Sequence, residues 1–278
     1  MAYILRGEKI GMALGKEMEE ISGAKVIING KDQLPSDDLC IRWGVTTSIP
    51  GNPKVINKIK AMEVTTDKRT FRDTCAKAGL SPKTWLSFEE YLLDKPQGLT
   101  ERVLIRPEYH QKSQDMILCT TLYELYKGIQ KFGKYYISEF IDKKREFRVF
   151  VAQNRVVWAI EKFPKDPTEM SWGCITTGEF EYIGWSEWPV EAVKVSLEAM
   201  KLSGLDFGAV DVIMDAEGKA YVMEINTAPY LTPYYMRCIA KVFKYMIEVG
   251  RDHLPDVDYS VSAKDYWKYV IHPAIADF

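Results

Sequence analysis

The sequence lacks the features that would place it among membrane, secreted or nucleic-acid-binding proteins. It carries 37 basic and 39 acidic residues, so no positive excess points to nucleic acid. No apolar run approaches the roughly 18 residues of a membrane span, and Arg6, Glu8 and Lys9 interrupt any signal-peptide pattern. The five cysteines form no CxxC pair, which argues against a zinc site or a disulfide framework. We therefore expect a cytoplasmic protein.

What the sequence does have is the composition of an ordered globular chain, with 46% hydrophobic and 12% aromatic residues over 278 positions. Residues 1–55 alternate short strands with one helix, which predicts a small α/β unit with parallel strands. The predicted strands are Tyr3–Leu5, Lys25–Ile28 and Leu39–Trp43, and the predicted helix is Lys9–Ile21. Pro50 and Pro53 mark the end of this unit.

Beyond this unit the pattern predicts helices and strands that suit two further lobes. The predicted helices are 54–78, 88–93, 122–132, 190–202 and 234–249, with a short one at 263–270. The predicted strands before residue 163 are 84–86, 103–106, 116–119, 135–140, 146–151 and 156–162, and residues 163–188 are expected to be irregular.

The most informative stretch is Gly208–Pro229, in which oxygen-bearing side chains interrupt two apolar strands. A four-residue loop at 215–218 predicts a β-hairpin with Asp211 opposite Val222. Glu224 then lies diagonally from Asp211 on the same face, followed by Asn226. Two carboxylates and an amide suit Mg²⁺. A loop of odd length would need a β-bulge to keep Glu224 on that face, and a hairpin with one solvated polar face is the alternative interpretation.

This hairpin and the order of the segments before it resemble those of the ATP-grasp superfamily. The resemblance is to its carboxylate–amine ligase branch, which includes phage-encoded members. The resemblance covers about residues 54–245 and is carried by Gly204–Asp211 followed by Glu224-Ile225-Asn226. It implies an ATP-grasp fold of the α/β (α+β) class, with Asp211, Glu224 and Asn226 holding Mg²⁺ on the ATP phosphates. Two lobes, 56–134 and 135–250, would clamp ATP after a Rossmann-like pre-ATP-grasp domain (1–55) and before a tail (251–278).

The resemblance also implies the nucleotide contacts. Glu139, Phe140 and Ile141 resemble the hinge that binds adenine through backbone groups, and Glu146 resembles the ribose-binding acid. Lys68 and Arg106 resemble the cations that reach the phosphates, with arginine where the family usually has lysine. Arg148 and Lys162 are the candidate catalytic cations, whereas the neighbouring Lys143, Lys144 and Arg145 are interpreted as solvated. The candidate residues are Lys68, Arg106, Glu139, Phe140, Ile141, Glu146, Arg148, Lys162, Asp211, Glu224 and Asn226.

Two departures from the family pattern concern catalysis. Residues 107–115 contain no glycine where relatives carry a glycine-rich phosphate loop, leaving His110, Lys112 and Ser113 as substitute donors. No arginine lies between residues 156 and 236, where related ligases often place one. The segment Ser171–Gly178 is a candidate substrate wall.

The implied reaction joins a small-molecule or peptide-like carboxylate to an amine through an acylphosphate, with ATP and Mg²⁺ as cofactors and release of ADP and phosphate. An ATP-binding regulatory protein without ligase turnover stays open, as does a Mg²⁺-dependent nuclease or phosphatase. Asp211→Ala and Glu224→Ala are expected to abolish turnover while the fold survives. The aromatic tail (Tyr259, Tyr266, Trp267, Tyr269) suits internal packing or an oligomer contact.

Overall fold

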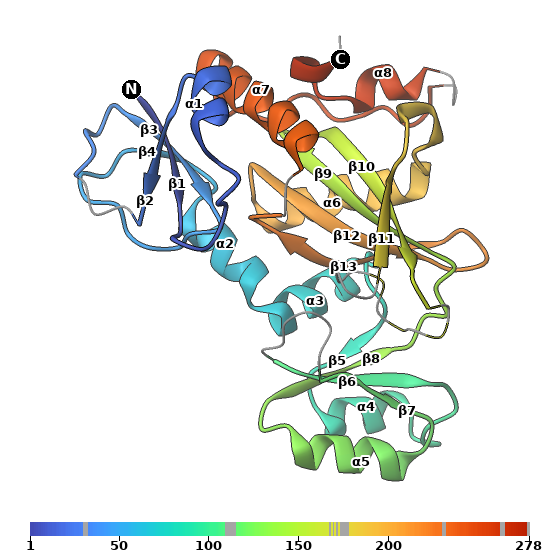
Figure 1. Ribbon diagram of the computed structural model, residues 1–278. Coiled ribbons are helices and arrows are strands. Elements are labelled where there is room, and N and C mark those ends of the chain that lie inside the picture. The colour runs from blue at the N-terminus through green and yellow to red at the C-terminus, as the bar shows by residue number, and fades with distance from the viewer. Residues whose placement is uncertain are drawn as a thin grey trace.

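The computed structural model describes residues 1–29, 33–108, 115–166, 168, 170, 172, 178–229, 232–261 and 265–276. Three β-sheets organise the chain, each with helices packed beside it (Figure 1). A parallel sheet lies at the N-terminus, a small antiparallel sheet at the opposite end, and a five-stranded antiparallel sheet between them. This confirms the predicted mixed α/β class.

The N-terminal sheet has the order β2-β1-β3-β4, and every pairing is parallel, as predicted. Its strands are β1 (Ala2–Arg6), β2 (Lys25–Ile28), β3 (Leu39–Trp43) and β4 (Lys54–Ile56). Strand β4 replaces the predicted start of a helix at Lys54. Helix α1 (Lys16–Ser22) begins later than the predicted Lys9, because Gly11 is left-handed (φ +73°) and Gly15 is extended (φ −137°).

Asn57 joins the N-terminal unit to the central sheet. It is fully buried with left-handed backbone geometry (φ +62°). Its side-chain amide donates to the Phe207 carbonyl at 3.0 Å, and its Oδ1 accepts from the N–H groups of Asp206 (2.8 Å) and Phe207 (3.2 Å). Its own N–H donates to Asp206 Oδ2 at 2.7 Å. One buried side chain therefore satisfies backbone groups of Asp206 and Phe207, which lie 149 and 150 residues later in the chain.

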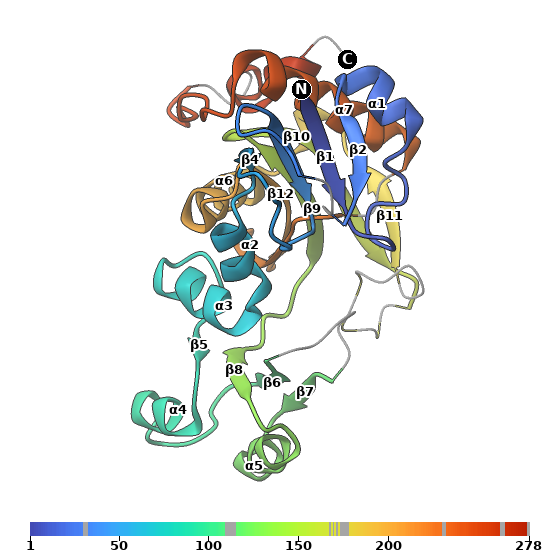
Figure 2. The ribbon, with the colours of Figure 1, turned by 90° about the vertical axis from the view of Figure 1, so that its left-hand side faces the viewer.

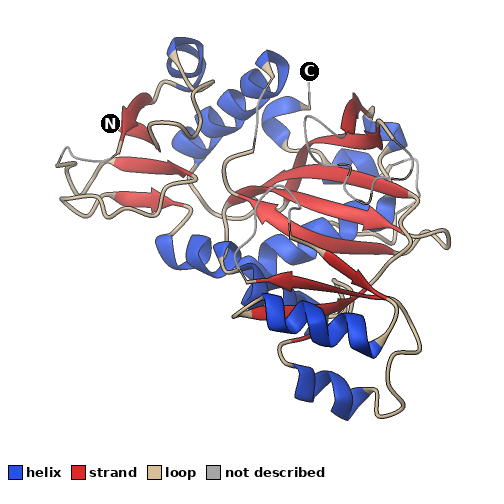
Figure 3. Cartoon of the chain, turned by 60° about the horizontal axis from the view of Figure 1, so that its bottom comes forward, coloured by secondary structure: helices blue, strands red, loops and turns tan. Residues whose placement is uncertain are grey.

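The small sheet has the order β5-β8-β6-β7. Its strands are β5 (Thr84–Trp85), β6 (Val103–Pro107), β7 (Ile117–Cys119) and β8 (Tyr135–Glu139). Helices α4 (Phe88–Asp94) and α5 (Leu122–Lys131) lie together on one side of it (Figures 1 and 3). Because β8 pairs with β5 and β6, the small sheet continues to Glu139, past the predicted lobe boundary at residue 135.

The central sheet has the order β11-β10-β9-β12-β13, and α6 packs against β9, β12 and β13. Its strands are β9 (Arg145–Ala152), β10 (Arg155–Pro164), β11 (Gly178–Tyr182), β12 (Phe207–Met214) and β13 (Ala220–Asn226). The associated helices are α2 (Ile59–Thr66), α3 (Lys68–Lys77), α6 (Val190–Ser203) and α7 (Pro233–Val249), with a 3₁₀ turn at Trp185–Glu187. The predicted helix 54–78 is thus two helices, and β11 lies in a region predicted to be irregular.

Aromatic packing fixes the N-terminal sheet against the central sheet and α7. Trp43, at the end of β3, stacks on Phe207 with ring centroids 5.8 Å apart and meets Phe243 of α7 edge-on at 6.0 Å. The next residue, Gly44, is left-handed (φ +65°), and a Cβ there would lie 2.5 Å from the Cβ of Ala228. Figure 2 shows the N-terminal sheet beside the central sheet. The first unit therefore reaches the segment directly after Asn226.

The C-terminal segment returns to the hairpin between β9 and β10. It contains α8 (Tyr266–Val270) and a 3₁₀ turn at Pro273–Ile275. Gln153 Nε2 donates to the carbonyls of Gly250 (2.9 Å) and Asp252 (2.8 Å), and its Oε1 lies 3.1 Å from His272 Nε2. Because the Ala274 N–H donates to His272 Nδ1, the neutral ring carries its proton on Nε2 and donates it to Gln153.

The burial of His272 predicts an acid-sensitive fold. Burial, with the nearby charge of Arg155, lowers the pKa of His272 to about 3. The unfolded chain binds this proton below about pH 6.5 and the folded chain does not, so stability falls as the pH falls through that window. When the pH is lowered from about 7.5 to about 5, the free energy of unfolding should fall in both proteins. The fall should be about 2 kcal/mol smaller in His272→Gln than in the unmodified protein. Urea denaturation at both pH values measures this, and equal losses would contradict it.

None of the described helices combines the length and apolar character of a membrane span. Four cysteines in the described part of the chain, Cys40, Cys75, Cys119 and Cys238, are buried and unpaired.

Candidate functional site

A cavity of about 390 Å³ lies between the small sheet and the central sheet. Its described lining has seven basic and five acidic side chains, an excess of two positive charges that suits an anionic ligand. The basic residues are Lys68, Arg72, Arg102, Arg106, Lys143, Arg148 and Lys162, and the acidic residues are Glu139, Asp142, Glu146, Asp211 and Glu224. The cavity therefore gathers every predicted site residue except Asn226, which contacts two of the lining residues.

The hairpin brings the predicted metal ligands together by a route that differs from the prediction. Met214 pairs with Ala220, so the loop has five residues instead of four. Asp211 pairs directly with Glu224, and Val212 pairs with Val222, which leaves Met223 as an extra residue on β13. This β-bulge corrects the odd loop and returns Glu224 to the face of Asp211.

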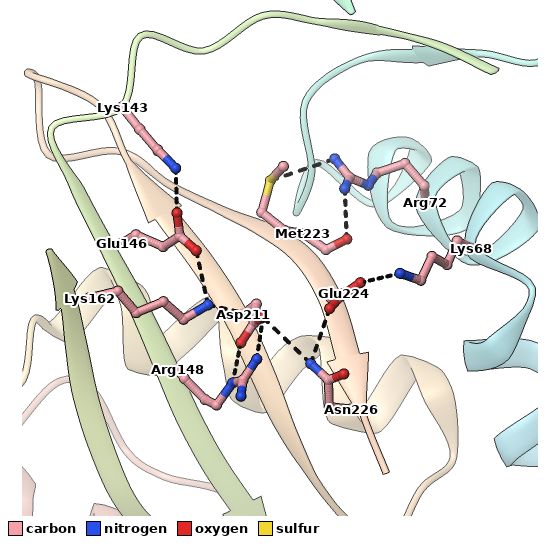
Figure 4. A network of polar contacts seen from close by, with 10 residues as sticks. All are labelled: Lys68, Arg72, Lys143, Glu146, Arg148, Lys162, Asp211, Met223, Glu224 and Asn226. Carbon is pink, nitrogen blue, oxygen red and sulfur yellow. Dashed lines mark hydrogen bonds and ion pairs between the residues drawn. The ribbon is translucent and has the colours of Figure 1, made fainter. Parts of the chain in front are cut away.

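Asp211 lies in a buried cluster with two cations (Figure 4). Arg148 donates Nε and Nη2 to the two oxygens of Asp211 at 2.7 and 2.8 Å, and Lys162 Nζ lies 3.0 Å from Oδ2. Burial alone would raise the pKa of Asp211, but Arg148 and Lys162 outweigh it and hold the pKa below the ordinary value. Asp211 is therefore ionised, as a metal ligand must be.

Glu146 holds two lysines. Its Oε1 accepts from Lys162 at 2.9 Å, and its Oε2 contacts Lys143. Burial raises the pKa of Glu146, but Lys162 and Lys143 outweigh it, so the net shift is downward. Lys162 is fully buried and bridges Glu146 and Asp211, which fixes the direction of its ammonium group. Both oxygens of the predicted ribose acid therefore already have partners, and ribose hydroxyls would need the remaining lone pairs or the displacement of Lys143.

Glu224 and Asn226 complete the hairpin face. Lys68 Nζ lies 2.7 Å from Glu224 Oε2, and the amide nitrogen of Asn226 lies 3.2 Å from Glu224 Oε1 and 3.5 Å from Asp211 Oδ2. Burial and Asp211 both raise the pKa of Glu224, but cations led by Lys68 lower it overall. A half-turn of the Asn226 amide would present its oxygen beside the two carboxylates.

These three oxygen-bearing side chains fit a hard divalent cation. They converge on one face, and both carboxylates are charged at neutral pH. Among the described residues, no group of three or more His, Cys, Asp or Glu side chains is placed to hold a metal ion by itself, so a bound cation would need further oxygens from a ligand or water. Phosphate oxygens supply such ligands to Mg²⁺.

The predicted adenine hinge and the predicted phosphate cation line the same cavity. Glu139 ends β8 and accepts from the Lys83 N–H through Oε2 at 3.1 Å, while the Phe140 N–H donates to the Arg102 carbonyl. The Ile141 N–H has no hydrogen-bond partner among the described residues and is available to a base edge. In the same part of the chain, Arg106 Nε is buried without a partner, so this guanidinium has unused donor capacity.

Four charged residues of the cavity lining were not predicted from the sequence, namely Arg72, Arg102, Asp142 and Lys143. The run of three cations predicts a solvated Lys143, yet this residue lines the cavity, contacts Glu146 and lies 4.5 Å from the Trp172 ring centroid. Arg72, in the middle of α3, is buried against β13. Its spacing of four from Lys68 was the only available signal, because residues four apart share a helix face. Lys144 and Arg145 instead pair with Asp142 and Glu161.

Some predicted features fall outside the described residues. They are His110, Lys112 and Ser113 of the glycine-free loop, and most of the segment 171–178. Within that segment, Trp172 lines the cavity near Lys143.

Several solved structures resemble this one in fold at low sequence identity. D-alanine–D-alanine ligase from Bacillus anthracis has 16% identity and a TM-score of 0.58, covering 89% of this chain and 94% of that one. The ATP-grasp ligase PsnB with minimal precursor, Mg and ADP has 13% identity and a TM-score of 0.62, covering 89% and 96%. D-cycloserine synthetase DcsG has 13% identity and a TM-score of 0.61, covering 87% and 99%.

A search of curated protein sequences finds no match. The family model of the RimK-like ATP-grasp domain, in contrast, matches residues 59–249, which contain every candidate site residue. The fold is an ATP-grasp fold, and the chain belongs to the RimK-like ATP-grasp family.

Proposed function

We propose that the protein is an ATP- and Mg²⁺-dependent ligase that joins a carboxylate to an amine and releases ADP and phosphate. The observation that carries this proposal is the paired placement of Asp211 and Glu224 in a cavity with excess positive charge. Family membership and the likeness to solved ligases support it. The ATP-grasp ligase PsnB has been solved in complex with a precursor peptide, so a peptide carboxylate is a substrate to test beside small molecules.

In this proposal the residues of the chain bind and orient the reacting groups. Ile141 and its neighbours receive adenine, and Lys68 and Arg106 bind phosphate oxygens. Mg²⁺, held by Asp211, Glu224 and Asn226, would supply charge neutralisation on the phosphates. A substrate carboxylate attacks the γ-phosphate in line, and the resulting acylphosphate is attacked by the amine.

Arg148 and Lys162 are the proposed catalytic cations. Arg148 uses Nε and Nη2 on Asp211 and keeps Nη1 for another acceptor. Lys162 uses two of its three N–H groups on Glu146 and Asp211. Each therefore has a fixed direction and spare donor capacity, which suits stabilisation of charge that develops in a transition state.

The experiment combines the purified protein, Mg·ATP and pools of carboxylates and amines, including peptides. ADP and phosphate should form only when both substrates are present, and ¹⁸O from a labelled carboxylate should appear in the released phosphate. AMP and pyrophosphate as products would contradict the acylphosphate route.

The second candidate function is an ATP-binding regulatory protein without turnover. It is favoured by one observation: both oxygens of Asp211 are already bound by Arg148. Tight ATP binding with no ADP release from any pool would support it over the ligase.

A further inference from the structure

The bulge residue Met223 is held from outside the central sheet. Strand β13 is the edge strand, so the outward-facing backbone groups of residues near Met223 have no neighbouring strand to pair with. Arg72 of α3 supplies a donor: its Nη2 lies 2.7 Å from the Met223 carbonyl oxygen, and its Nη1 lies 3.6 Å from the Met223 sulfur (Figure 4). Arg72 is only 4% exposed, so this contact is a buried one.

The segment that follows α3 holds the neighbouring residue of β13 in the same way. The Val222 N–H donates to the Leu80 carbonyl at 2.7 Å, and Ser81 Oγ donates to the Val222 carbonyl at 2.6 Å. Two successive carbonyls at the bulge are therefore held by side chains: that of Val222 by Ser81 and that of Met223 by Arg72. Without such anchors, the extra residue could shift along the strand, and a shift of one position would turn Glu224 toward the core.

We propose that Arg72 is a positioning residue, which fixes the Met223 bulge and thereby aims Glu224 at the divalent-cation site. This inference rests on the proposed function, because it assumes that Glu224 binds the cation. Helix α3 then acts on β13 at two places from one face. Lys68 contacts the Glu224 carboxylate, and Arg72, one turn later, holds the preceding carbonyl.

A purely electrostatic role for Arg72 predicts the opposite sign. A buried positive charge near Glu224 repels a divalent cation, so its removal alone would tighten cation binding. Loss of the hydrogen bond to Met223 would weaken cation binding, because Glu224 would no longer be held in place. The direction of the change therefore separates the two roles.

The test measures Mn²⁺ binding to the protein–ADP complex by electron paramagnetic resonance, together with ADP binding in the absence of metal. Arg72→Met should weaken Mn²⁺ binding by about tenfold or more, the usual cost of losing a group that orients a metal ligand. Metal-free ADP binding should change far less. Arg72→Lys, which keeps one donor, should recover part of the Mn²⁺ affinity.

Arg69→Met is the matched control on the same helix. Arg69 likewise binds backbone, donating to the carbonyls of Tyr135 at 3.0 Å and Leu86 at 2.8 Å, but Tyr135 lies in strand β8 and Leu86 directly follows β5, both in the small sheet. Arg69→Met should therefore lower the midpoint of urea unfolding without a comparable loss of Mn²⁺ affinity. Equal losses in Arg69→Met and Arg72→Met would overturn the positioning role, as would unchanged or tighter Mn²⁺ binding in Arg72→Met.

Failure of the divalent-cation site itself looks different, because the unmodified protein would then show no Mn²⁺ binding that depends on ADP. A protein that binds Mn²⁺ with ADP but never releases ADP from ATP would contradict only the ligase reaction, and the test of Arg72 would stand. If Arg72→Met does not fold, Ser81→Ala tests the same idea through the Val222 carbonyl. It should weaken Mn²⁺ binding in the same direction, and an unchanged affinity would overturn the proposal.

Discussion

Replacing Glu224 by glutamine is expected to lower ATP turnover by about a thousandfold, as the loss of a group that supports transition-state charge typically does. The stability of the fold should barely change. The Glu224 and Lys68 side chains are each 29% exposed, so their ion pair contributes at most about 1 kcal/mol. Glutamine also keeps the volume and an oxygen for Asn226. Steady-state ADP release and urea denaturation measure the two effects.

Asp211→Asn is the comparison that separates ligand loss from damage to the fold. Asp211 is buried with Arg148 and Lys162, so its neutralisation leaves two buried cations poorly paired and should cost about 3–5 kcal/mol. The structure thus gives a reason to expect that Asp211→Ala lowers stability as well as turnover, contrary to the expectation from the sequence. Glu224→Gln with normal turnover would refute the metal role of Glu224.

Replacing Lys162 by methionine is the second large effect we expect, and it should reduce both activity and stability. Lys162 is fully buried between Glu146 and Asp211. Its replacement would leave these two buried carboxylates without the ammonium group that lies between them. A loss of about 3 kcal/mol is expected, because a buried ion pair broken on one side leaves uncompensated charge. Turnover should fall below detection, since the cation aimed at the phosphates is gone.

Lys143→Met provides the matched control, because Lys143 contacts the same Glu146 carboxylate without reaching Asp211. Its side chain is 14% exposed, whereas that of Lys162 is 0% exposed. It should therefore destabilise the fold less than Lys162→Met. A cost for Lys143→Met as large as that for Lys162→Met would mean that Glu146, instead of the bridge to Asp211, dominates the cluster.

The parts of the structure that the sequence predicts are those encoded by neighbouring residues. Helix α6 ends at a glycine in the left-handed conformation, and the strands of the N-terminal sheet carry short apolar runs. The sequence also predicts that Glu224 and Asn226 share a face of β13, because strand alternation is a local property.

The remainder depends on contacts between distant segments. The Met223 bulge is held by Arg72, 151 residues away in the chain, so no local pattern reveals it. Lys143 sits in a run of three cations, where a solvated side chain is the ordinary interpretation, and only the position of Glu146 and Trp172 places it in the cavity. Strand β8 follows a helix and precedes β9, yet it pairs backward with β5 and β6.

The Asn57 contact has a consequence for exchanging parts between relatives. A hybrid protein could combine the N-terminal unit of one ATP-grasp protein with the remaining domains of another. In this chain, the junction between these parts depends on hydrogen bonds that Asn57 makes to Asp206 and Phe207. A graft with its junction before residue 56 retains Asn57 and the backbone groups of Asp206 and Phe207 that it satisfies. A junction placed further along must bring a residue that tolerates left-handed geometry and offers both an amide donor and an acceptor. Few residues other than asparagine satisfy both requirements. The residue at position 57 therefore indicates, before a hybrid is built, whether its N-terminal unit and its central sheet can form this junction.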